Sequence, residues 1–127
     1  MMLLAAAQSS AGAIKDGLET VERALNSNPQ ELVHRPEALR IRGELRLKQD
    51  HRELAEADFV DSIAMARSMG AKAWELRTTM SLAHLLRDSG RRDEARAMLA
   101  EIYNWFTEGF GTLDLKDAKA LLDELAA

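Results

Sequence analysis

The side chains that could do chemistry are few, and their spacing does not assemble an active site. His34, His51 and His84 lie far apart and cysteine is absent, so no pair stands at the spacing of a zinc site. Asp93 and Glu94 could form an acid–base pair, but the helix macrodipole also favours acidic residues in a first helical turn. The sequence contains no phosphate-binding glycine loop and no nucleophile spaced to meet a base. It therefore predicts a protein that is not an enzyme, with no cofactor and no metal.

Two further groups of side chains could bind a partner, and each has a simpler structural explanation. The basic group consists of Arg91, Arg92 and Arg96. It is interleaved with acidic residues, which is typical of a solvated helix face. The aromatic group consists of Tyr103, Trp105, Phe106 and Phe110. At helical spacing before a last helix, these rings are expected to pack beneath Leu115, Leu121 and Leu122.

The composition predicts an all-helical domain of 127 residues. Apolar residues make up 46% of the chain and aromatic residues only 5%, with 2 prolines. The net charge of −4 argues against nucleic acid as a partner, since such proteins concentrate basic residues on one face. The apolar start, Met1–Ala7, is too short to span a membrane and has no basic residue before Lys15. A cytoplasmic location without membrane contact is the expectation.

Apolar residues at spacings of three and four predict about seven helices with short connections. The expected helices span about 1–8, 13–26, 29–48, 52–68, 71–88 and 113–126, with a further helix after Gly90 whose apolar stripe runs from Ala95 to Phe106. Gly12 is expected to end the first helix, Gly70 to cap the fourth, and residues 109–111 to form a turn. Pro36 either begins the third helix or kinks it, and the kink is favoured. Thr112 or Asp114 is expected to cap the last helix.

Small residues recur around three presumed turns at Gly12, Asp50 and Gly90. The positions seven residues before these turns hold Ala5, Gly43 and Ala83, and those five residues after hold Gly17, Ala55 and Ala95. Four residues further on come Val21, Phe59 and Leu99. Facing small residues let two helix axes approach closely. The chain is therefore expected to be one domain of stacked antiparallel hairpins, with units at about 1–28, 29–69 and 70–110 and a capping helix at 113–126.

The spacing of Gly43, Ala55 and Phe59 resembles the small, small and large-apolar positions of tetratricopeptide repeats. Ala83, Ala95 and Leu99 repeat this pattern. The units recur after 38 and 40 residues, from Ala5 to Gly43 to Ala83, and lack the family's tyrosine and closing proline. The resemblance implies a tetratricopeptide-like right-handed superhelix that binds proteins or peptides.

The stretch Trp105-Phe106-Thr107-Glu108-Gly109-Phe110, which leads into residues 114–118, resembles the C-terminal end of large bacterial signalling proteins. The resemblance covers about residues 30–125 and is most specific over 105–110, with departures at Glu101 and Gly111. Those proteins join a predicted signal-transduction ATPase module to helical repeats, often with a class III adenylate or guanylate cyclase or a winged-helix domain. This chain has neither the phosphate loop nor the cyclase metal carboxylates. The resemblance therefore implies a regulatory module without enzymatic residues of its own.

Repeat scaffolds bind partners on the concave surface lined by the first helix of each unit. The residues expected there are Glu37, Arg40, Glu44, Lys48, Arg77, Met80, His84 and Arg87. Their basic tilt predicts a partner segment rich in Asp or Glu, with the alternative that these charges only keep the surface soluble.

The expected function is a protein–protein interaction scaffold that regulates a bacterial signalling ATPase or cyclase system. The alternative is a sensory domain for a small ligand, controlling an ATPase, a cyclase or a transcription regulator. The short first helix is expected to leave apolar surface that forms a homo-oligomer. At the other end, a polar outer face is expected to cap the stack with Lys116, Asp117, Lys119, Asp123 and Glu124.

Overall fold

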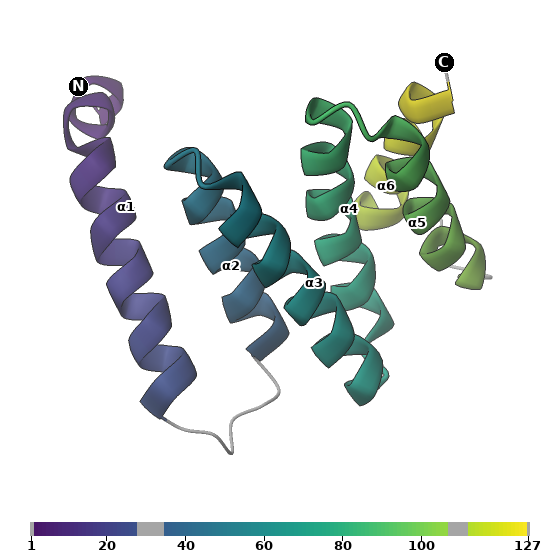
Figure 1. The fold of residues 1–127 in the computed structure, drawn as a ribbon, viewed down its shortest axis with the longest axis horizontal. Coiled ribbons are helices and arrows are strands. Elements are labelled where there is room, and N and C mark those ends of the chain that lie inside the picture. Colours follow the sequence, from purple (N-terminus) through teal and green to yellow (C-terminus); the bar gives the residue numbers. More distant parts are fainter. Residues whose placement is uncertain (1, 28–34, 107–111, 127) are drawn as a thin grey trace.

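The computed structural model describes residues 2–27, 35–106 and 112–126, which form helices joined by tight turns and contain no strand (Figure 1). The helices are α1 (Met2–Ser27), α2 (Arg35–Lys48), α3 (Arg52–Met69), α4 (Lys72–Asp88), α5 (Arg92–Trp105) and α6 (Leu113–Ala126). The expected all-α fold is confirmed. The hand of its superhelix stays a prediction.

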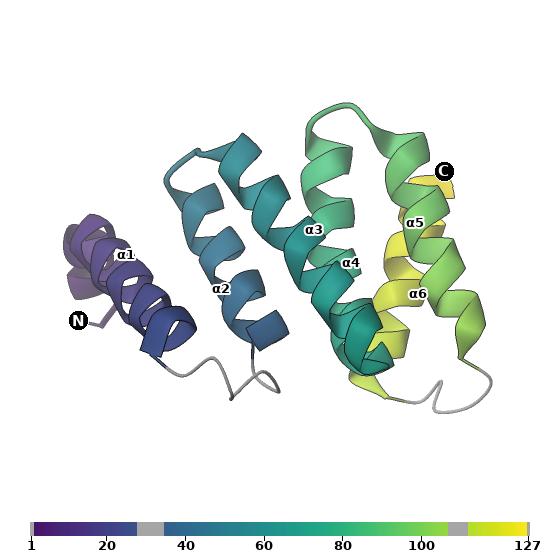
Figure 2. The same cartoon turned by 60° about the horizontal axis from the view of Figure 1, so that its bottom comes forward.

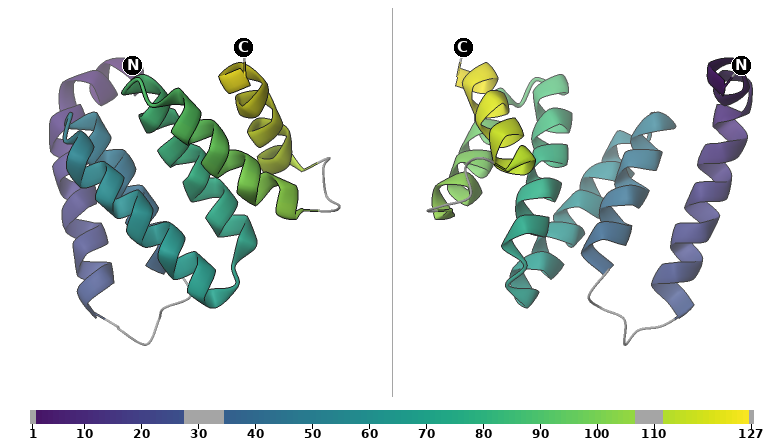
Figure 3. Two further views of the ribbon diagram at one scale, coloured as in Figure 1. Left: turned by 45° about the vertical axis from the view of Figure 1, so that its right-hand side comes forward. Right: turned by 180° about the vertical axis from the view of Figure 1, so that it is seen from behind.

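Each helix packs antiparallel against the next one along the chain, so the helices form adjacent pairs (Figure 2). Helix α4 also contacts both α2 and α6, which places every second helix from α2 onward on a common side of the stack. At one edge of the molecule lies α1, and at the opposite edge lie α5 and α6 (Figure 3). This is the arrangement that stacked helical hairpins produce.

Three successive helices end in the same left-handed turn. Asp50, Gly70 and Gly90 have φ angles of 62°, 67° and 79°. In each turn the next amide donates to the carbonyl five residues back, as from His51 to Arg46 (2.9 Å) and from Arg91 to Leu86 (2.7 Å). This bond pattern closes a helix through one left-handed residue. The turns at Asp50 and Gly90 are therefore equivalent, as the repeat predicted.

Asp50→Gly is expected to raise the free energy of unfolding by up to about 1 kcal/mol, because only glycine takes a left-handed φ without a steric cost. The side chain of Asp50 contributes little, since it is 89% exposed and pairs with Arg52 only at 3.7 Å. Gly90→Ala is the matched opposite change and should lower the same quantity by about 1 kcal/mol. Urea denaturation measures both. A loss of stability in the Asp50 variant would contradict this account.

The closest approach described inside a helix pair is at Gly43, between α2 and α3. A Cβ atom on Gly43 would lie 2.5 Å from Cε1 of Phe59, so the ring of Phe59 occupies the space that a side chain would need. Ala55 and Phe59 are fully buried in the α2–α3 pair, and Ala83, Ala95 and Leu99 are buried in the α4–α5 pair. The small positions are therefore buried in both pairs, and direct contact between Gly43 and Ala55 or between Ala83 and Ala95 stays a prediction.

The expected break at Gly12 is wrong, because α1 runs without interruption from Met2 to Ser27. A glycine inside a helix costs only about 1 kcal/mol relative to alanine, and the neighbouring alanines favour helix. The predicted hairpin of residues 1–8 and 13–26 therefore does not exist, and the described chain holds six helices instead of seven. Gly17 still lies at a close approach, because a Cβ atom added to it would be 3.1 Å from Cδ1 of Leu45 on α2.

Pro36 lies in the first turn of α2, where proline is tolerated, so the alternative of a helix that begins near Pro36 is correct. The presumed start at Pro29 lies outside the described residues, as do His34, Phe110 and the turn at 109–111. The last helix begins after Thr112, whose carbonyl accepts a hydrogen bond from the amide of Lys116 (3.0 Å). Of the two expected capping residues, Thr112 thus holds the position.

The expectation that Trp105 packs in the core is wrong. Trp105 is the last residue of α5 and is 56% exposed. Its ring lies under the ammonium group of Lys72 at 5.3 Å and meets Phe106 edge to face at 5.2 Å. Tyr103 and Phe106 are partly buried against the core, as predicted. Leu54, in the first turn of α3, is 50% exposed.

Candidate functional site

The candidate site is the surface formed jointly by α2, α4 and α6, which we call the α2–α4–α6 face. The eight residues predicted for the groove lie on the first two of these helices at helical spacing, and all are exposed or half-buried. The structure adds side chains of α6, namely Asp114, Asp117, Ala120, Leu121 and Glu124. Of these, the sequence had assigned Asp117 and Glu124 to a polar cap.

A chain of ion pairs crosses this face from α2 to α6. Arg40 Nε donates to Glu37 Oε1 at 2.6 Å, and Arg77 Nη1 donates to Glu37 Oε2 at 3.3 Å. Arg77 Nη2 then donates to Asp114 Oδ2 at 3.1 Å. The hydrogen bond from Arg40, aided by the charge of Arg77, lowers the pKa of Glu37 below its ordinary value. The hydrogen bond to Asp114 raises the pKa of Arg77, so these groups stay charged.

A second connection joins the far ends of α4 and α6. Arg87 Nη1 donates to Glu124 Oε1 at 2.9 Å, and its Nε donates to Asp88 at 3.2 Å. Arg77 and Arg87, the two arginines of α4 in the predicted groove, are therefore paired with carboxylates of α6. The sequence held one signal for this, because Arg77–Asp114 and Arg87–Glu124 are both separated by 37 residues.

A hollow of about 460 Å³ lies between α4 and α6. Met80 and Leu121 contribute apolar surface to it, and Arg77, Ser81, His84, Asp114, Asp117, Ala120 and Glu124 complete the lining. His84 on α4 and Asp117 on α6 are exposed and make no ion pair or hydrogen bond within the described part of the chain. The hollow thus has an apolar patch, with the unengaged His84 on the α4 wall and the unengaged Asp117 on the α6 wall.

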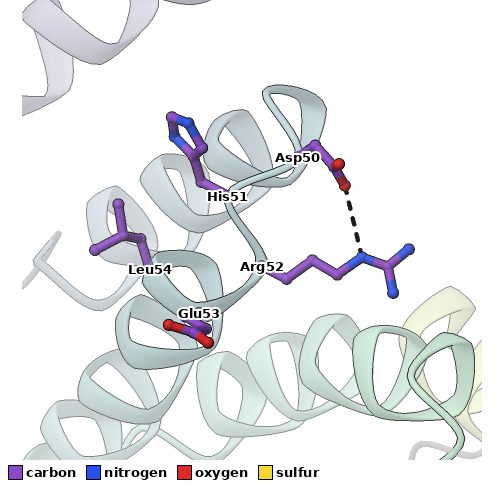
Figure 4. Close-up of a pocket in the computed structure, with 5 residues that line it drawn as sticks. All are labelled: Asp50, His51, Arg52, Glu53 and Leu54. Atoms are coloured by element: carbon purple, nitrogen blue, oxygen red, sulfur yellow. Dashed lines mark ion pairs between the residues drawn. The ribbon is translucent and has the colours of Figure 1, made fainter.

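A larger hollow, of about 560 Å³, opens beside the turn between α2 and α3 (Figure 4). Its described lining is Asp50, His51, Arg52, Glu53 and Leu54, all exposed. The side chains of His51 and Leu54 point to one side, whereas Asp50 and Arg52 pair with each other on the other side. These groups do not converge on a common point, so this hollow is the weaker candidate.

Asp58 and Glu75, the buried carboxylates among the residues that the structure describes, are both partnered and hold helices together. Asp58 of α3 is 2% exposed and accepts hydrogen bonds from Arg42 Nη2 (2.8 Å) and Arg46 Nη1 (3.0 Å) of α2. Glu75 of α4 is 3% exposed and accepts one from Arg67 Nε of α3 (2.8 Å). Sequence reasoning missed both carboxylates, because acidic residues on helices are usually exposed.

The residues first considered for chemistry do not come together. Among the residues that the structure describes, no group of three or more His, Cys, Asp or Glu side chains could hold a metal ion. Glu94 lies in the first turn of α5 and accepts hydrogen bonds from Arg91 Nε (2.8 Å) and Nη2 (2.9 Å). Arg91 also donates to Glu56 of α3 at 2.8 Å, so this arginine links two helix pairs.

Comparisons with protein-family models, with curated proteins and with solved structures find no match to this chain. None of the described helices combines the length and the apolar character needed to cross a bilayer. The site must therefore be judged from its own geometry.

Proposed function

We propose that this chain is a non-enzymatic, tetratricopeptide-like interaction module whose α2–α4–α6 face docks a segment of another protein. The supporting observation is the hollow between α4 and α6, with Met80 and Leu121 as its apolar surface and unengaged His84 and Asp117 at its walls. Partner segments bind helical arrays through a few apolar anchors with polar groups around them. The face offers that combination on helices held rigidly by ion pairs.

The regulatory setting is the second part of the proposal. The resemblance over residues 30–125 supports a cytoplasmic module that controls a bacterial signalling ATPase or cyclase. In this setting the partner is the ATPase or cyclase protein itself, or a domain joined to it. The module contributes binding and orientation, and the partner contributes the chemistry.

A site-specific photo-crosslinker tests the docking function. Benzoylphenylalanine at Ser81, in the hollow, should crosslink to a purified ATPase or cyclase protein encoded beside this one. The same group at Ala97, which is exposed on α5 away from the face, is the control and should remain unlinked. Crosslinking at Ala97 with none at Ser81 would move the docking surface elsewhere, and no crosslink at either position would count against the docking function.

The alternative of a small-ligand sensory domain is favoured by one observation, the volume of the same hollow. About 460 Å³ is within the range of small-molecule sites. A metabolite that raises the melting temperature, with the rise abolished by Ser81→Trp, would support this alternative. A broad metabolite collection that produces no shift would leave protein docking as the function.

A further inference from the structure

The chemistry of the hollow between α4 and α6 specifies the partner segment more closely than the proposed function does. Resting on that function, we infer that the occupant is a basic segment that places a Lys or Arg side chain on Asp117 and an apolar side chain against Met80 and Leu121. This inference reverses the polarity expected from the sequence, and it depends on groups that α6 brings to the face.

The formal charges of the hollow favour a cation. Asp114, Asp117 and Glu124 supply three carboxylates to the lining, whereas Arg77 supplies the guanidinium among the same lining residues. An incoming cation meets a complementary field there, and an incoming carboxylate meets like charge. Because Asp117 has no partner within the described residues, a basic side chain can bind it without displacing an existing ion pair.

The remaining hydrogen-bonding capacity points the same way. Asp114 accepts from Arg77 through Oδ2, and Glu124 accepts from Arg87 through Oε1. An ionised carboxyl group offers about four acceptor positions, so both keep unused acceptors toward the hollow. Arg77 already spans two carboxylates, those of Glu37 and Asp114. The hollow is thus richer in free acceptors than in free donors, which suits an ammonium or a guanidinium group.

The apolar patch explains why the occupant is a protein segment and not a free cation. Met80 is half-buried and lines the hollow, where Leu121, which is 4% exposed, adds a small carbon surface beside the carboxylates. Methionine adapts to side chains of different shape. A segment with a basic residue next to Leu, Ile or Met satisfies both surfaces at once.

Fluorescence anisotropy with two labelled peptides tests the inference. The peptides have equal length and consist of Leu and Ala, with either Lys or Glu at every fourth position. At physiological salt, the Lys peptide should bind about tenfold more tightly than the Glu peptide. Asp117→Lys should weaken its binding about tenfold, since it replaces the free acceptor with a like charge. Asp123→Lys is the control, with the same charge change on the same helix but outside the hollow, where Asp123 pairs with Lys119 at 3.2 Å.

The control should stay within about twofold of the unaltered chain, because salt screens distant surface charges. If both substitutions weakened binding equally, the effect would come from the net charge of the protein and not from Asp117, and the inference would be overturned. It would also be overturned if neither peptide bound. Tighter binding of the Glu peptide, lost in Ser81→Trp, would overturn the basic class while leaving docking at this face intact. Thermal unfolding of each variant, followed by circular dichroism, verifies that the comparison is made between folded proteins.

Discussion

Gly43→Ala should lower the free energy of unfolding by about 1–3 kcal/mol, although alanine is the better helix former. The new Cβ would lie 2.5 Å from Cε1 and 2.8 Å from Cδ1 of Phe59. Phe59 is fully buried, so its ring cannot swing into solvent and must displace its neighbours. The strain exceeds the gain in helix propensity, and urea denaturation should report a lower midpoint.

Two further variants separate this steric effect from others. Gly12→Ala changes the same residue type inside α1, where a new Cβ meets nothing within 4 Å of the described structure, and should raise the stability by up to about 1 kcal/mol. Phe59→Leu in the Gly43→Ala background should recover part of the loss, because the two positions share one space. If Gly43→Ala were neutral or stabilising, the tight contact between α2 and α3 would not exist in solution.

Asp58→Asn is expected to have the second large effect, a loss of about 2–4 kcal/mol. The substitution keeps the shape but removes the negative charge, and it leaves the guanidinium groups of Arg42 and Arg46 without a charged partner at a position 2% exposed. The arginine side chains keep 21% and 19% exposure, so water compensates them in part and holds the loss below the upper limit for a buried pair.

Asp61→Asn provides the comparison for Asp58→Asn. Asp61 lies one turn further along α3, is exposed and has no ion pair among the described residues, so its substitution should change the stability by less than about 0.5 kcal/mol. Thermal and urea unfolding of the two variants should therefore differ clearly. Similar values for both would mean that Asp58 is hydrated in solution and that the contact with the two arginines contributes nothing.

The parts of the fold that could be predicted from the sequence depend on local pattern. The helices α3 and α4 follow from apolar spacing closed by a left-handed turn, and α5 follows from apolar spacing alone; both signals are confined to a few residues. A close contact at Gly43 could also be anticipated, because small residues at equivalent positions of each unit indicate that two helices approach closely there. The helix break predicted at Gly12 is wrong because one glycine only weakens a helix, and the neighbouring residues decide whether the helix continues.

The parts that could not be predicted depend on contacts between distant segments. Asp58 and Glu75 are buried only because arginines from another helix reach them, and apolar periodicity does not register such pairs. The residues predicted for the face lie on α2 and α4, but the charge of the face also depends on α6. The sequence predicts Asp114 as a possible cap and Glu124 on the outer face of the last helix, and only the packing of α6 beside α4 brings them to Arg77 and Arg87.

The turns at Asp50, Gly70 and Gly90 share one backbone conformation. The number of helices in this stack can therefore change without a change in the type of turn that joins them. A second copy of residues 51–90 placed after Gly90 would follow a left-handed turn and end in one, as residues 51–90 do in this chain. A chain of this kind can therefore gain or lose whole hairpins through duplication or deletion of its coding sequence, because the same turns join the helices. Each hairpin gained or lost extends or shortens the interaction surface by one unit.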